Sequence, residues 1–144
     1  MHILFTRPLE DCHEMMLKFQ SLGNEVSHLP LINIEGLKHE PLNYFDFKGI
    51  IFTSSNAIKF LDIKKIDKKI ICFCVGSATE KKARSVGFQN IFVAEGNVNN
   101  LKELILQNFN SSDGKLLYVS GEIISNQLDQ QLISEGYNIK RIIN

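Results

Sequence analysis

Short apolar runs alternate along the chain with longer segments in which apolar residues recur at helical spacing. Residues 49–53 read Gly-Ile-Ile-Phe-Thr, an unbroken run that is typical of a strand buried on both faces. Residues 100–109 instead place Leu101, Leu104 and Ile105 on one side of a helix. These two patterns predict strands over 3–6, 25–34, 49–53, 70–75, 91–93, 116–119 and 138–143, and helices over 9–22, 57–61, 80–86, 100–109 and 125–135.

A glycine follows three of these helices, and each time the next residues form an expected strand. The glycines are Gly23, Gly87 and Gly136, placed where a helix-ending residue takes a left-handed conformation. Repeated strand–helix units imply parallel strands joined by right-handed crossovers. Residues 49–143 therefore predict an α/β fold with a doubly wound parallel sheet of flavodoxin-like order, which binds ligands at the carboxyl ends of its strands.

Composition narrows the class of protein. The 144 residues are 44% hydrophobic and 22% charged, which excludes a disordered chain or a coiled coil. Basic and acidic residues balance at 16 each, so neither nucleic acid nor an anionic membrane is an expected partner. No apolar segment is long enough to span a bilayer, and residues 1–8 do not form a signal peptide. The three cysteines indicate reduced thiols and a cytoplasmic location.

Common catalytic and cofactor motifs are missing. Neither GxxxxGK[ST] nor a GxGxxG after a strand occurs. Cys72 and Cys74 share one face of a strand and lack the spacing of a zinc site, so we expect them in the core. The histidines form neither a close pair nor an HExxH motif; they are His2, His13, His28 and His39. The residues therefore indicate neither a P-loop nor a zinc site.

Small polar residues instead gather where the expected strands end, in the segments 6–7, 53–56, 76–79 and 120–121. Each segment leads toward a helix N-terminus, where free N–H groups and the helix dipole attract anions. Plain helix capping, worth about 1 kcal/mol for each cap, is the alternative for any single segment. Taken together, the segments favour a rim that binds an anionic ligand. No aspartate stands at these strand ends, which disfavours a receiver-like phosphoacceptor.

Several strings resemble the motifs of one enzyme family. Residues 3–8 (ILFTRP), 52–57 (FTSSNA), 75–79 (VGSAT), 83–87 (ARSVG) and 117–121 (LYVSG) occur in the order and spacing of the uroporphyrinogen-III synthase family. Residues 22–26 and 29–34 are similar to the family's amino-terminal segment. The individual motifs are loose, but their order is specific and covers nearly the whole chain.

The resemblance implies an enzyme that cyclises hydroxymethylbilane with inversion of its terminal pyrrole ring, without metal or cofactor. It also implies two βα domains, with residues 1–35 opening the first and residues 36–144 forming the second. Substrate-binding candidates carried over by motif, together with neighbouring strand-end residues, are Arg7, Thr53, Ser54, Asn56, Gly76, Ser77, Thr79 and Gly121. Thr79 matches a family threonine on the cleft and is the preferred contact. No catalytic residue is assigned.

Two departures from the family pattern matter. Ser120 stands where the family usually has arginine before glycine, which predicts a weaker anion contact. The return of the chain to the first domain is also absent, so the first domain is expected to be incomplete. Three hypotheses follow: a truncated synthase polypeptide, a non-catalytic module that binds a small anion or a tetrapyrrole, or a half-enzyme completed by self-association or by a partner chain.

Overall fold

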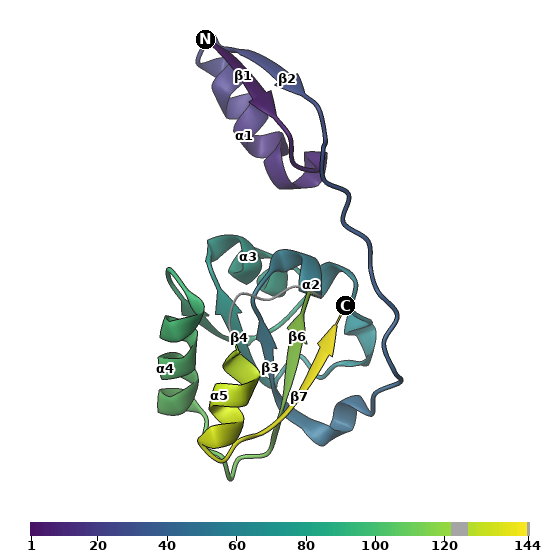
Figure 1. Ribbon diagram of the computed structural model, residues 1–144, viewed down its shortest axis with the longest axis vertical. Coiled ribbons are helices and arrows are strands. Elements are labelled where there is room, and N and C mark those ends of the chain that lie inside the picture. The colour runs from purple at the N-terminus through teal and green to yellow at the C-terminus, as the bar shows by residue number, and fades with distance from the viewer. Residues whose placement is uncertain (122–126, 144) are drawn as a thin grey trace. The chain divides into compact units, whose positions relative to one another are not determined.

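A computed structural model describes residues 1–121 and 127–143. The chain divides into two compact units, Met1–Glu35 (unit 1) and Gly36–Asn144 (unit 2). Figure 1 shows both units and labels most of their helices and strands. The interpretation of unit 1 as the opening piece of a first domain, and of unit 2 as a second βα domain, stays a prediction.

Unit 1 is a single strand–helix–strand segment made of β1 (His2–Phe5), α1 (Leu9–Ser21) and β2 (Glu25–His28). The two strands pair in parallel, with Phe5 opposite His28. The rings of Phe5 and Phe19 lie 6.2 Å apart between centroids, which joins the helix to the sheet. Among residues 1–35, all of which are described, Cys12 is the one buried hydrophobic side chain. Unit 1 therefore has almost no core of its own.

Unit 2 alternates strands with helices, as the apolar pattern predicts. All strand pairs of its five-stranded sheet are parallel, in the order β5-β4-β3-β6-β7. In chain order, its described elements are 3₁₀ helix η1 (Tyr44–Asp46), β3 (Phe47–Phe52), α2 (Ser55–Lys59), 3₁₀ helix η2 (Ile63–Lys65), β4 (Ile71–Val75), α3 (Ser77–Ser85), β5 (Asn90–Ala94), α4 (Val98–Asn108), β6 (Lys115–Ser120), α5 (Leu128–Ser134) and β7 (Asn138–Ile143).

The doubly wound parallel sheet predicted from the sequence is confirmed. Its strand order differs in one respect from the flavodoxin-like order. Counted from β3, the spatial order is 3-2-1-4-5, whereas a flavodoxin-like order is 2-1-3-4-5. The chain therefore builds outward from β3 through β4 to β5, and then crosses back to place β6 on the other side of β3. This makes the carboxyl ends of β3 and β6 the point at which the winding reverses, where such sheets bind ligands.

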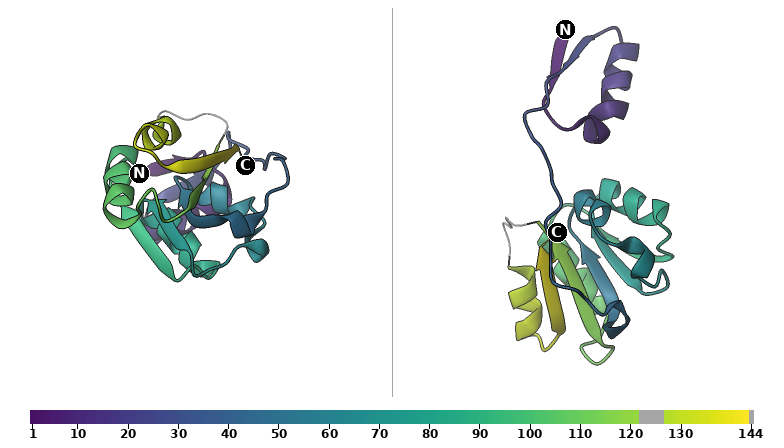
Figure 2. Two further views of the ribbon diagram at one scale, coloured as in Figure 1. Left: turned by 90° about the horizontal axis from the view of Figure 1, so that it is seen from below. Right: turned by 90° about the vertical axis from the view of Figure 1, so that its right-hand side faces the viewer.

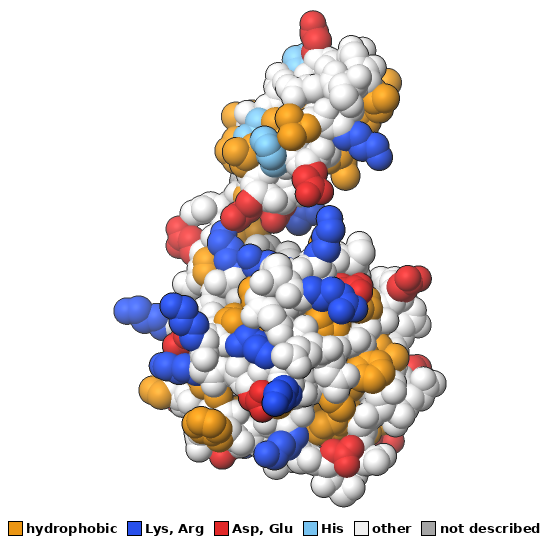
Figure 3. Space-filling view, turned by 180° about the vertical axis from the view of Figure 1, so that it is seen from behind, with side chains coloured by type: hydrophobic (Ala, Val, Ile, Leu, Met, Phe, Trp, Pro, Cys, Tyr) orange, Lys and Arg blue, Asp and Glu red, His pale blue; other side chains and the backbone are white. Residues whose placement is uncertain are grey.

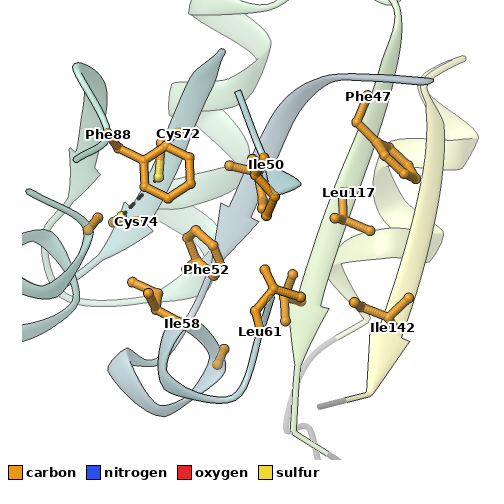
Figure 4. Packing of buried hydrophobic residues seen from close by; sticks show 14 residues of the cluster. Phe47, Ile50, Phe52, Ile58, Leu61, Cys72, Cys74, Phe88, Leu117 and Ile142 are labelled. Atoms are coloured by element: carbon orange, nitrogen blue, oxygen red, sulfur yellow. Dashed lines mark hydrogen bonds between the residues drawn. The ribbon is translucent and has the colours of Figure 1, made fainter. Parts of the chain in front are cut away.

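Helices cover both faces of the sheet (Figure 2), and alternate residues of each strand point to opposite faces. Ile50, Phe52, Cys72 and Cys74 pack on the face covered by α2 and α3 (Figure 4). On the other face, Ile51, Phe73 and Tyr118 belong to the cluster that contains Leu101 and Ile105 of α4, and Leu128 and Leu132 of α5. Two separate apolar layers therefore stabilise unit 2.

The expected thiol pair lies in the first of these layers. Cys72 and Cys74 are fully buried and unbridged, with their sulfur atoms 3.7 Å apart. Their contact, followed by burial, raises the pKa of the Cys72 thiol. The prediction that both are core residues is confirmed.

The three largest differences between predicted and observed element limits concern β2, α3 and α5. The strand expected over 25–34 ends at His28, although the N–H groups of Leu29 and Leu31 still donate to the carbonyl oxygens of Phe5 and Thr6. The helix expected over 80–86 begins at Ser77: Gly76 adopts φ +81°, so the chain turns from β4 directly into the helix without the expected turn over 76–79. Of the helix expected over 125–135, residues 125–126 lie outside the described residues, and α5 covers Leu128–Ser134.

The three glycines that follow helices behave as predicted. Gly23, Gly87 and Gly136 have φ values of +84°, +104° and +89°. Residues with a side chain rarely adopt this conformation, because the Cβ atom then approaches the following carbonyl oxygen. These glycines end α1, α3 and α5 and redirect the chain into the next strand.

Candidate functional site

The candidates of unit 2 follow the carboxyl ends of neighbouring parallel strands. Phe52 of β3 lies opposite Cys74 of β4 on one side and Val119 of β6 on the other. The segments that follow these residues therefore leave the sheet at the same edge. This edge brings together 53–56, 76–79 and 120–121, whereas Arg7 belongs to unit 1.

Helix α2 begins with an ordinary side-chain cap. Ser54 has an extended backbone, and its Oγ accepts a hydrogen bond from the N–H of Asn56 at 3.2 Å. This bond satisfies one of the helix's free donors. Ser54 therefore acts as a plain helix cap, which was the alternative to anion binding for each of these segments. Asn56, in the first turn, is partly exposed.

Helix α3 begins differently. Its capping position is Gly76, which has no side chain, and no side-chain cap bond is formed there. The first-turn N–H groups of Ser77, Ala78 and Thr79 thus have no capping side-chain acceptor, and the helix dipole adds positive potential at the same place. Ser77 is exposed, whereas Thr79 is 4% exposed and faces the core side of the turn. An anion can approach this turn closely, because a Cβ added at Gly76 meets no atom within 4 Å.

Thr53 contacts a tyrosine that sequence reasoning did not select. Tyr118 of β6 is 2% exposed, and burial raises the pKa of its hydroxyl. A side-chain hydrogen bond with Thr53 and the charge of Arg141 both lower this pKa, while the charge of Asp129 raises it. Thr53, Tyr118 and Arg141 therefore form a polar cluster at the ends of three strands.

Arg141 of β7 hydrogen-bonds to the end of β6. Its Nε donates to Ser120 Oγ at 2.7 Å, and its Nη2 donates to the carbonyl oxygen of Gly121 at 3.2 Å. Ser120 is fully buried, whereas Arg141 is partly exposed. The serine thus orients the guanidinium, which extends outward from the end of β6.

A signal for Arg141 was present in the sequence. The segment 138–143 reads Asn-Ile-Lys-Arg-Ile-Ile, so two basic residues interrupt an otherwise apolar strand. The register places Arg141 beside Tyr118 and Lys140 beside Leu117, on opposite faces of the sheet. Only the pairing of β6 with β7 tells which basic residue reaches Ser120.

Arg7 makes its contacts within unit 1. Its guanidinium lies 3.8 Å from Asp11 Oδ2. The carbonyl oxygen of Arg7 is 2.7 Å from His28 Nε2. The positive charge of Arg7 is thus paired with the carboxylate of Asp11, four residues further along the chain.

Charges of both signs are interspersed on the surface seen in Figure 3. In the described part of the chain, no three His, Cys, Asp or Glu side chains gather so that they could hold a metal ion. Likewise, none of the helices described has both the length and the apolar character needed to cross a membrane.

Unit 2 is a doubly wound parallel α/β domain, and members of this class commonly bind ligands at the carboxyl ends of their strands. The sequence model of the family uroporphyrinogen-III synthase HemD matches residues 13–143, so the chain belongs to the uroporphyrinogen-III synthase family, as its motifs predict. No curated protein matches the chain in a sequence search.

A solved structure is similar in fold. It is the crystal structure of uroporphyrinogen-III synthetase from Helicobacter pylori 26695, with 17% sequence identity and a TM-score of 0.62. The match covers 99% of this chain and 59% of the other, so this chain spans less than two-thirds of that relative's length.

Proposed function

We propose that the chain acts in tetrapyrrole biosynthesis as a uroporphyrinogen-III synthase, which cyclises hydroxymethylbilane and inverts its terminal pyrrole ring. The family match over residues 13–143 carries this proposal. The rim of unit 2 supports it, because uncapped N–H groups and small hydroxyls can bind the substrate's carboxylates without a surplus of basic residues. Holding the linear substrate in a ring-closing conformation is then much of the catalysis.

The proposed substrate contacts are those predicted from the motifs, with the first turn of α3 at their centre. Ser77 is exposed there and α3 lacks a side-chain cap, which supports an anion contact at this turn. Gly76, Thr79, Asn56 and Gly121 belong to the same proposal. Thr53 and Ser54 contribute through their positions, since the Thr53 side chain bonds to Tyr118 and Ser54 Oγ caps α2.

An isomer assay tests the activity. The 144-residue chain is incubated with hydroxymethylbilane, and the cyclised products are oxidised and separated by chromatography. We expect the type III isomer in excess over a protein-free reaction. Ser77→Ala should lower its yield, whereas Ser85→Ala, at the other end of the same helix, should leave it unchanged. A product mixture identical to the protein-free reaction would contradict catalysis by this chain.

Binding without catalysis is the second candidate function. It is favoured by the location of every candidate except Arg7 in unit 2, which has a complete two-layer core of its own. Titration with uroporphyrin, a stable tetrapyrrole polycarboxylate, separates the two functions. Saturable binding with no type III product would support the binding module and contradict the synthase.

The partners and compartment follow from the same proposal. The free cysteines support a cytoplasmic location, because free thiols persist in reducing compartments. The exposed apolar side chains of unit 1, among them Leu4 and Leu17, support completion by a second copy or by a partner chain. Light scattering over a concentration series tests self-association, which a strict monomer would exclude.

A further inference from the structure

Arg141 differs from the other arginines of the chain in what balances its charge. Arg7 lies 3.8 Å from the carboxylate of Asp11, and Arg84 lies 3.1 Å from that of Glu80. In the described ranges 1–121 and 127–143, Arg141 bonds only to the neutral oxygens of Ser120 and Gly121, and no carboxylate lies within ion-pair distance of it. A half-buried guanidinium whose described partners are all neutral can form an ion pair with an anion.

The hydrogen bonds of Arg141 also orient its side chain. A guanidinium carries five N–H donors in a fixed plane. The described contacts use Nε and one N–H of Nη2, and they hold the plane at the end of β6. The remaining donors match the two oxygens of a carboxylate, which such a group binds through parallel hydrogen bonds.

We propose that Arg141 supplies, from β7, the cationic carboxylate contact that Ser120 cannot make at the end of β6. This assignment rests on the proposed function and names one carboxylate-binding residue of that site. Ser120 Oγ positions the guanidinium, and Thr53 and Tyr118 lie beside it at the adjacent strand ends. The ligand class is a tetrapyrrole polycarboxylate. In this way Arg141 would compensate for the weaker anion contact that serine at position 120 predicts.

Titration of the full chain with uroporphyrin, followed by absorbance, tests the assignment. Arg141→Gln should weaken binding roughly tenfold to a hundredfold, as expected for the loss of a charge-assisted bidentate contact. Lys140→Gln is the matched control, because it removes the same charge from the adjacent position on the opposite face of β7. It should change affinity by less than about twofold. Equal losses in the two variants would overturn the assignment and indicate a general effect of charge.

Two further variants separate a binding role from a structural one. Arg141→Lys retains the charge without the planar fork and should bind with intermediate affinity. The exchange Ser120→Arg with Arg141→Ser returns a guanidinium to the same strand end and should recover binding relative to Arg141→Ser alone. Circular dichroism checks the fold of each variant. Failure of both rescues in folded protein would overturn the assignment.

Uroporphyrin binding by the unaltered chain separates a failure of the Arg141 assignment from a failure of the proposed function. If the unaltered chain binds uroporphyrin and Arg141→Gln binds equally well, the Arg141 assignment fails while the proposed function stands. If the unaltered chain does not bind uroporphyrin at all, both fail. Added salt should weaken binding by the unaltered chain more than binding by Arg141→Gln, since one ion pair fewer is screened.

Discussion

Units 1 and 2 contain the same kinds of strands and helices, but their hydrophobic side chains are buried to different degrees. In each, a helix that ends at a left-handed glycine joins a pair of parallel strands: β1 and β2 in unit 1, and β4 and β5 as well as β6 and β7 in unit 2. Unit 2 encloses its sheet between two helical layers, and residues such as Phe73 and Leu101 are fully buried. Unit 1 covers its two-stranded sheet with one helix and leaves Leu4, 55% exposed, at its surface. Local signals thus form the elements, and a second layer provides the core.

The chain's chromophores allow this comparison to be tested directly. It contains no tryptophan, and its tyrosines, Tyr44, Tyr118 and Tyr137, all lie in unit 2. Tyrosine fluorescence therefore reports the unfolding of unit 2, whereas far-ultraviolet circular dichroism reports both units.

The largest expected effect comes from the core of unit 2. Phe73→Ala removes a ring that packs 5.7 Å from Phe92 and 6.5 Å from Phe109, between centroids. It should lower the free energy of unfolding by about 3–5 kcal/mol. Urea unfolding followed by tyrosine fluorescence measures this loss. Phe19→Ala, in unit 1, is the control and should not shift that transition; a comparable shift would mean that the two units unfold as one.

The next effect concerns the glycines that end helices. Alanine at Gly136 would keep a left-handed φ of +89° with open space around the new methyl group, so the cost is backbone strain of about 1–2 kcal/mol. Gly23→Ala should carry the same local cost in unit 1. Only the Gly136 variant should lower the urea midpoint seen by tyrosine fluorescence. Equal shifts in both variants would contradict the independence of the units.

A smaller effect is expected at a helix cap. Ser54→Ala removes the oxygen that accepts from the Asn56 N–H and should lower the stability of unit 2 by about 1 kcal/mol. Ser21→Ala, in the last turn of α1, removes an exposed hydroxyl bonded to Lys18 and serves as the control. Its effect should stay below about 0.5 kcal/mol. Thermal unfolding measures both, and a neutral Ser54 variant would contradict the capping role.

The smallest expected change in stability is a loss in unit 2 at alkaline pH. Burial raises the pKa of Tyr44, Tyr118 and Tyr137 above the ordinary value of 10.0. Below that value both the folded and the unfolded chain bind these protons. As the pH rises past 10, the unfolded chain loses them first, so the free energy of unfolding falls.

A spectroscopic titration of the tyrosines checks this prediction. Arg141→Gln should raise the pKa of Tyr118 further, because the guanidinium charge favours the phenolate. Unit 1 has no tyrosine and should therefore give no signal in this titration. A tyrosine titration curve at the ordinary pKa in folded protein would contradict the burial of these hydroxyls.

The sequence by itself determined the elements, because their signals are local. Unbroken apolar runs predicted the strands, and a glycine free to adopt positive φ marked the ends of α1, α3 and α5. The motifs at the strand ends were enough to predict the family, which the match over residues 13–143 confirms. The start of α3 was missed, because Gly76 joins β4 to the helix without a separate turn.

The tertiary structure alone decided which strand ends are neighbours. The order β5-β4-β3-β6-β7 depends on which face each crossover packs against, and no short segment encodes that choice. The same packing sets the register that places Arg141, rather than Lys140, beside Tyr118 and Ser120. A one-residue slip would turn the guanidinium to the opposite face. The arginine was visible in the sequence, but its role depends on a contact between residues 21 positions apart.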